Sequence, residues 1–129
     1  IRKELTDEWK SRGLKEGVQF ATLTDIISKA WSGKTTKEYK MLKGLKKENL
    51  RDNMTNTELI LNMLAEASTK DISKATNPET FEDNKQVAQQ GGNVAKVAMK
   101  ELESKTGKKV VTALNAKNAL NQNQIKDKN

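Results

Sequence analysis

The side chains that could carry out chemistry in this chain are carboxylates, lysines and hydroxyls, because the sequence contains no histidine and no cysteine. Imidazole and thiolate groups supply most general bases, activated nucleophiles and transition-metal ligands in proteins. A phosphate-binding glycine loop needs a strand before it, and Gly91-Gly92 lacks one. We therefore predict that the protein is not an enzyme and that it uses no cofactor.

Two groups of carboxylates could bind a hard cation: Asp52 with Glu58, and Glu79 with Glu82 and Asp83. Neither group has the closely spaced oxygen ligands of a calcium-binding loop. Acidic residues in the first turn of a helix complement the positive end of the helix dipole. We therefore interpret these carboxylates as helix caps and predict no metal site.

A cluster of basic residues is the sharper feature of the sequence. The formal net charge of +7 is unevenly distributed: residues 1–33 are near neutral, residues 34–51 carry +5, residues 52–83 carry −5 and residues 84–129 carry +6. A broad basic face suits a phosphate backbone, because contacts there need charge more than register. The alternative is that the acidic segment lies across a basic one. The predicted nucleic-acid-binding residues are Lys34, Lys37, Lys40, Lys43, Lys46, Lys47 and Arg51.

Two aromatic residues, Trp31 and Tyr39, flank this cluster and could stack on bases, as aromatic side chains do in single-strand binders. In the other interpretation both rings belong to the core, and the lysines only solvate the surface. Aromatic residues make up only 4% of the chain. Since a core needs the few that are present, the core interpretation of the two rings is the favoured one.

The densest apolar run predicts a central helix from Thr55 to Ser73. Thr55 and Glu58 have the spacing of a capping box, in which each side chain accepts a backbone N–H of the other residue. The residues from Leu59 to Ala67 make this helix apolar almost all round. Such a helix must be covered by its neighbours. We predict that it is buried at the centre of an all-α domain, and that the turn carrying Lys43 and Lys47 faces outward.

The first predicted helix has apolar residues at every fourth position and ends near Gly13. Its Glu8 and Arg12 are spaced for an ion pair, which we place on the outside of the helix.

The second predicted helix holds apolar residues at a spacing of three and four from Phe20 to Trp31, and it ends at Gly33. Thr24 and Asp25 are the side chains that could cap its start.

A third helix and a short turn lie between the second helix and the central one. Thr35 and Glu38 form another capping-box candidate, and this helix is predicted to stop at Gly44. A single further turn is predicted over residues 48–53.

A long helix is predicted after the central one. Asn77 followed by Pro78 indicates its start, because asparagine caps well and proline suits the first helical position. The apolar phase continues across Gly91 and Gly92, so we predict one helix as far as Gly107. The paired glycines would then let a neighbour approach closely or mark a kink.

The chain is predicted to form a single helical domain over residues 1–107, with a polar C-terminal tail over 108–129. The architecture expected is a compact bundle of five or six helices. Residues 110–114 give a brief apolar contact, and the tail from Asn115 is expected to be mobile or weakly helical. No apolar run is long enough to cross a bilayer, so we expect a cytoplasmic protein without membrane contacts. Because Ile1 is no natural start, we interpret the sequence as a piece of a longer protein.

Part of this sequence, roughly residues 18–105, resembles the C-terminal region of DNA-damage-inducible protein D and of related prophage antirepressor-like proteins with a BRO-type N-terminal domain. The residues that carry the resemblance are Lys43-Gly44-Leu45-Lys46-Lys47, Met54, Thr57-Glu58-Leu59 with Asn62, and Trp31 with Gly33. The chain lacks the glycine- and tyrosine-rich approach to the basic turn, and its tail after Gly107 matches poorly. The resemblance implies a bacterial or prophage protein that is induced by DNA damage, in an SOS-type response, and acts on recombination or transcription without an enzymatic step.

Two hypotheses for function follow. The first is a non-enzymatic regulatory module, downstream of a missing N-terminal domain, that contacts DNA or a recombinase filament through the basic residues 34–51. The second is a structural or oligomerisation module, in which the long C-terminal helix pairs with a partner chain. In that case a homo-oligomer is expected and no nucleic acid is bound.

Overall fold

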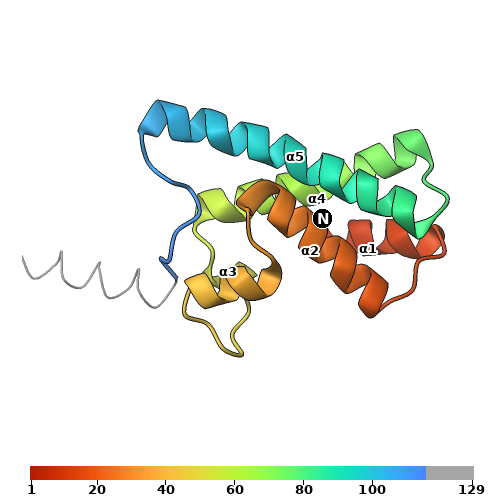
Figure 1. Ribbon diagram of the computed structural model, residues 1–129, viewed down its shortest axis with the longest axis horizontal. Helices are drawn as coiled ribbons and strands as arrows, with labels where there is room; N and C mark the ends of the chain where they lie inside the picture. The colour runs from red at the N-terminus through yellow and green to blue at the C-terminus, as the bar shows by residue number, and fades with distance from the viewer. Residues whose placement is uncertain (116–129) are drawn as a thin grey trace, which may run out of the picture.

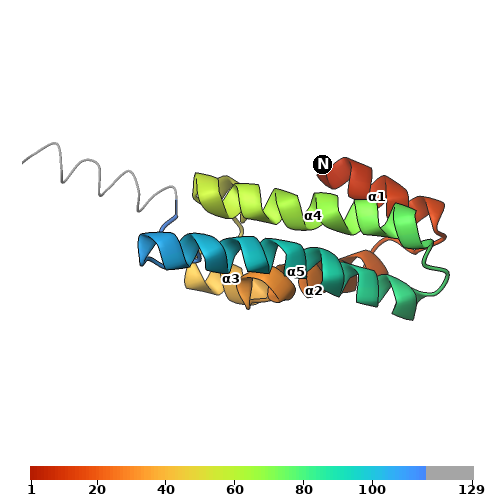
Figure 2. The ribbon, with the colours of Figure 1, turned by 90° about the horizontal axis from the view of Figure 1, so that it is seen from above.

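The computed structural model describes residues 1–115 and is all-α, as predicted (Figure 1). No strand occurs among these residues. The elements are α1 (Arg2–Ser11), α2 (Val18–Ser32), α3 (Thr36–Leu42), a single 3-10 turn (Arg51–Asn53), α4 (Asn56–Thr76) and α5 (Phe81–Thr106). Figure 2 shows α4 and α5 running side by side, with α1 on the far side of α4.

Both predicted capping boxes are present, so the starts of α3 and α4 are determined locally. The Glu58 N–H donates to Thr55 Oγ1 at 3.2 Å, and the Thr55 N–H donates back to Glu58 Oε1 at 3.0 Å. Thr35 and Glu38 make the same exchange at the start of α3. The backbone N–H of Thr35 holds the pKa of the Glu38 carboxyl below its ordinary value.

The start of α5 differs from the prediction. Asn77 ends α4 in a left-handed conformation, with φ at 52°, and Pro78 is buried in the turn that follows. The side chain of Thr80 caps α5 instead, by accepting the N–H of Asp83 at 3.0 Å. Asparagine tolerates the left-handed region, so it suits the end of one helix as well as the start of another.

The start of α2 also lies earlier than the predicted caps. The helix begins at Val18, directly after Gly17, and it contains both Thr24 and Asp25. Neither side chain caps α2. Asp25 accepts the N–H of Thr36 at 3.1 Å instead, and so ties α2 to the start of α3.

The aromatic side chains belong to the core, as the favoured interpretation held. Trp9, Trp31 and Tyr39 are at most 1% exposed. Trp9 packs edge-on against Phe20, with 5.2 Å between the ring centroids. Other members of this core are Leu5, Leu23, Ile27, Leu45, Leu50, Leu61, Ala65, Ala88 and Ala95.

Gly91 and Gly92 lie inside the continuous helix α5 and allow close packing, as predicted. A Cβ atom on Gly91 would lie 1.9 Å from Thr69 Oγ1 and 2.7 Å from the Thr69 backbone, in α4. A Cβ atom on Gly92 would lie 2.4 Å from the Ala30 Cβ and 2.8 Å from the carbonyl oxygen of Ile27, both in α2. The paired glycines therefore seat α5 against α4 and α2 at the same time.

The central helix α4 is covered on three sides rather than all round. It packs against α1, α2 and α5, and Leu61 is only 6% exposed. Ile60 is 64% exposed and Leu64 is 36% exposed, because no described element covers that face. The prediction that neighbours cover α4 completely is wrong there.

Glu8 and Arg12 face the interior of the bundle, which corrects the prediction that they lie outside. Glu8 is 7% exposed and accepts hydrogen bonds from Arg12 Nε at 2.8 Å and from the hydroxyl of Ser73 at 2.6 Å. Burial alone would raise the pKa of Glu8, but these two hydrogen bonds and the Arg12 charge lower it overall. Since Ser73 belongs to α4, this cluster fastens α1 to α4.

The chain continues to contact the bundle after α5. In Figure 1 the blue segment after α5 descends towards α3. The Val110 N–H donates to Glu103 Oε2 at 3.0 Å, Val110 and Val111 pack against the core, and Asn115 is buried. The folded body thus extends past the boundary predicted at Gly107. The tail predicted to be mobile or weakly helical begins at Asn115, and that first residue is instead buried and donates to the carbonyl of Lys43. The rest of the predicted tail, residues 116–129, lies outside the described residues.

Candidate nucleic-acid interface

The structure divides the predicted basic cluster, and Lys43 is its buried member. Lys43 is 1% exposed, and its ammonium pairs with Glu58 Oε1 at 2.6 Å. The ammonium also donates to the carbonyl of Leu114, while the side chain of Asn115 donates to the carbonyl of Lys43. A buried cation needs such partners, since an isolated charge is very costly to remove from water. The predictions that Lys43 faces outward and binds nucleic acid are therefore wrong.

The hydroxyl of Tyr39 completes this buried group by donating to Glu58 Oε2. Burial, this hydrogen bond and the Glu58 charge all raise the pKa of Tyr39 above its ordinary value, so the phenol stays protonated at physiological pH. Trp31 is fixed in a similar way, because its indole N–H donates to Asn62 Oδ1 at 3.3 Å. With both rings buried, neither is available to stack on a base.

Arg51 is the second member of the cluster that pairs with a carboxylate. Glu66, on α4, is only 4% exposed and accepts from Arg51 on one oxygen and from Arg2 Nη1 at 3.1 Å on the other. Arg2 also donates to Thr24 Oγ1 at 2.7 Å. The alternative that acidic residues of the segment 52–83 neutralise basic ones is thus correct for Lys43 and Arg51.

The other members of the cluster are not paired with a buried glutamate, and we call them together the outer lysine face. Lys37, Lys46 and Lys47 are exposed, and Lys34 and Lys40 are half-buried. Within residues 1–115, none of these side chains makes an ion pair with a carboxylate. The outer lysine face consists of Lys34, Lys37, Lys40, Lys46 and Lys47.

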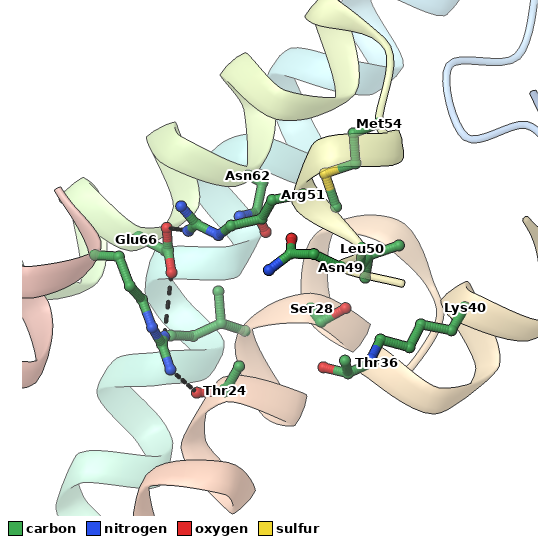
Figure 3. Close-up of a pocket in the computed structure, with 12 residues that line it drawn as sticks. Thr24, Ser28, Thr36, Lys40, Asn49, Leu50, Arg51, Met54, Asn62 and Glu66 are labelled. Carbon is green, nitrogen blue, oxygen red and sulfur yellow. Dashed lines mark hydrogen bonds and ion pairs between the residues drawn. The ribbon is translucent and has the colours of Figure 1, made fainter. Parts of the chain in front are cut away.

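Two hollows adjoin this face. The first, which we call the inner cavity, has a volume of about 240 Å³ and lies where α1, α2, α3, the 3-10 turn and α4 meet (Figure 3). Its charged and amide side chains are Arg2, Lys40, Asn49, Arg51, Asn62 and Glu66. The second, the outer groove, has a volume of about 620 Å³ and shares Arg2, Thr24, Thr36 and Lys40 with the inner cavity.

Arg2 and Glu66 were missed by sequence reasoning. They lie 64 positions apart, and no periodic pattern connects residues at such a distance. The opposite net charges of residues 34–51 and 52–83 indicate that these two segments could form ion pairs with each other. They do not identify Arg2, which lies outside both segments.

Three of the carboxylates considered as cation ligands have structural roles. Glu58 accepts the Thr55 N–H in the cap of α4 and forms an ion pair with Lys43. Glu82 forms an ion pair with Lys85 at 3.1 Å. Asp83 accepts the N–H of Glu79 at 3.4 Å. Within residues 1–115, no three acidic side chains come together in a way that could hold a metal ion.

None of the described helices combines the length and the apolar character needed to cross a membrane. Comparison of the chain with family models, with curated proteins and with solved structures found no match. The arrangement of the basic side chains is therefore the basis for assigning a function.

Proposed function

We propose that this chain is a non-enzymatic helical module that binds the phosphate backbone of nucleic acid through the outer lysine face. The observation that carries the proposal is the division of the basic cluster. Lys43 and Arg51 are neutralised by buried glutamates, whereas the outer lysines have no ion-paired carboxylate among the described residues. Uncompensated surface lysines attract phosphates and release counterions when they bind them.

The resemblance to DNA-damage-inducible proteins supports a role in a bacterial damage response. In that role the module contacts DNA, free or within a recombinase filament, and so modulates recombination or transcription in the cytoplasm. The N-terminal domain that the resemblance implies would supply other contacts. The exposed positions of Lys46 and Lys47, within the motif that carries the resemblance, agree with this assignment.

Charge reversal of two outer lysines tests the proposal. We expect Lys37→Glu with Lys46→Glu to weaken the binding of labelled single- and double-stranded oligonucleotides at least about tenfold, and uniformly across sequences. The slope of log affinity against log salt, measured by fluorescence anisotropy between about 50 and 200 mM salt, should fall by about two for a duplex. Both effects arise because each lysine neutralises a phosphate and releases its counterion.

The matched control is Lys96→Glu with Lys100→Glu, which makes the same charge change on exposed residues of α5. We expect this double variant to leave the slope of log affinity against log salt unchanged. If both pairs weaken binding equally, only the net charge of the chain matters, and the outer lysine face is not the interface.

A second candidate function is oligomerisation through α5. Val94 is 43% exposed and Val97 is 69% exposed, and residues three apart lie on the same side of a helix. Large apolar side chains grouped on a surface favour contact with another protein. This observation supports the alternative in which α5 pairs with a partner chain.

If α5 mediates self-association, the mass of the protein in solution should rise with concentration, and Val97→Lys should restore the monomer. Light scattering after size exclusion, at several micromolar concentrations, measures this. Val18→Lys is the control, because Val18 is 82% exposed but lies at the start of α2. A monomer at every concentration would remove this candidate.

A further inference from the structure

The charge balance of the inner cavity favours an anion. Arg2, Arg51 and Lys40 contribute three positive charges to its lining, and Glu66 contributes the one negative charge. Burial lowers the pKa of both arginines, and the Arg2 charge lowers that of Arg51 further. Arginine nevertheless keeps its charge in proteins. The cavity therefore has a formal excess of two positive charges.

Lys40 is the cation that is free to bind. Figure 3 shows its side chain reaching from α3 towards Thr36. Within residues 1–115, its ammonium has no hydrogen-bond or ion-pair partner, whereas both arginines contact Glu66. An ammonium has three N–H donors. Lys40 can thus bind a ligand without giving up an interaction inside the protein.

The two amide side chains of the cavity add hydrogen-bond donors. Asn62 Oδ1 accepts from Trp31, and Asn49 Oδ1 accepts the N–H of Asp52 at 3.3 Å. Within residues 1–115 neither NH₂ group donates a hydrogen bond, whereas each amide oxygen already accepts one, so the two NH₂ groups are donors that a ligand can use. The side chains of Asn49 and Asn62 both line the cavity (Figure 3).

The outer groove continues the inner cavity over an apolar surface. Beyond the shared residues, its lining includes Ala21, Leu45 and Met41, which is 70% exposed. Lys37 and Lys46 add positive charge to the groove, and Asp25 is its one acidic lining residue. A ligand that extends from the cavity into the groove would therefore combine an anionic group with a flat or apolar body.

We propose that the inner cavity binds the dianionic phosphate of a phosphate monoester, and that the attached nucleoside lies in the outer groove over Met41 and Ala21. The excess of two positive charges matches a monoester dianion better than the single charge of a backbone diester. The ligand is the terminal phosphate of a nucleic-acid strand or a free mononucleotide. If the ligand is the end of a strand, this inference rests on the proposed function, because the bound strand then has one of its ends beside the outer lysine face.

Strand-end binding is tested with short oligothymidines that carry a phosphate at the 5′ end, at the 3′ end or at neither end. We expect one of the two phosphorylated strands to bind at least about tenfold more tightly than the unphosphorylated strand, because charge-assisted hydrogen bonds are the stronger kind. Fluorescence anisotropy at a fixed salt concentration measures the difference. Lys40→Gln should abolish it, whereas Lys29→Gln, an exposed lysine of α2 outside both hollows, should preserve it.

Thymidine monophosphate, compared with thymidine, distinguishes the two sources of the ligand. If the free ligand is a mononucleotide, thymidine monophosphate should shift the backbone amide NMR signals around Lys40 and Asn49 more than thymidine does. If thymidine monophosphate causes these shifts while all three oligothymidines bind equally, the ligand is the mononucleotide. Failure of every oligonucleotide to bind would contradict the proposed function. Equal binding of all three strands, together with no response to thymidine monophosphate, would overturn this inference and leave the proposed function intact.

Discussion

Replacing Lys43 with alanine is expected to lower the free energy of unfolding by about 3–5 kcal/mol, because it leaves the carboxylate of Glu58 buried without its cation. Both side chains of this pair are fully buried. The substitution also removes the hydrogen bond that the Lys43 ammonium donates to the carbonyl of Leu114, and this loosens the segment after α5. Urea denaturation followed by circular dichroism measures the change.

A second variant separates the loss of the ion pair from the loss of packing. Lys43→Met with Glu58→Gln removes both charges, while glutamine at position 58 can still reach the Thr55 N–H in the α4 cap. We expect this double variant to recover at least half of the lost stability, because replacing both members of a buried pair is often nearly neutral. Lys47→Ala is the surface control, with an expected change within about 0.5 kcal/mol. An equal effect of Lys43→Ala and Lys47→Ala would contradict the buried pair.

Local signals explain why so much of the fold could be predicted. A capping box joins residues three apart, and the boxes at Thr35 and Thr55 are both present. The predicted end of α2 at Gly33 and the end of α5 at Gly107 are confirmed as well. In each case the stabilising contact lies within one turn of the residue that specifies it, so sequence spacing alone reveals it.

Contacts between distant segments explain why the candidate site could be predicted only in part. In the sequence, Lys43 is one lysine of a basic run, and nothing in its spacing separates it from Lys46. Its burial depends on Glu58 and on Leu114, which is 71 positions away. The inner cavity likewise needs Arg2, which only the folded chain brings to Glu66. Charge composition predicted a basic surface, but the packing of α4 decides which cations stay on it.

The glycine pair of α5 is where tertiary packing most clearly overrides helix propensity. In an exposed helix, Gly91→Ala would stabilise by about 1 kcal/mol. Here the added Cβ would lie 1.9 Å from Thr69 Oγ1 and 2.7 Å from the Thr69 backbone. Overpacking costs about 1–3 kcal/mol, and more when the backbone must move, so we expect Gly91→Ala to lower the free energy of unfolding by about 2 kcal/mol. Asn93→Ala, at an exposed position of the same helix, should instead stabilise by a few tenths of a kcal/mol.

A variant of the neighbouring helix shows which contact opposes the added methyl group. Thr69→Ala removes the hydroxyl but leaves the α4 backbone in place, so it should rescue Gly91→Ala only in part. Full rescue would mean that the side chain alone sets the distance between α4 and α5. Unchanged or increased stability of Gly91→Ala by itself would contradict the close packing of the two helices. The distance matters for the site because α2 and α4, which Gly92 and Gly91 hold against α5, both line the inner cavity, through Thr24 and Glu66.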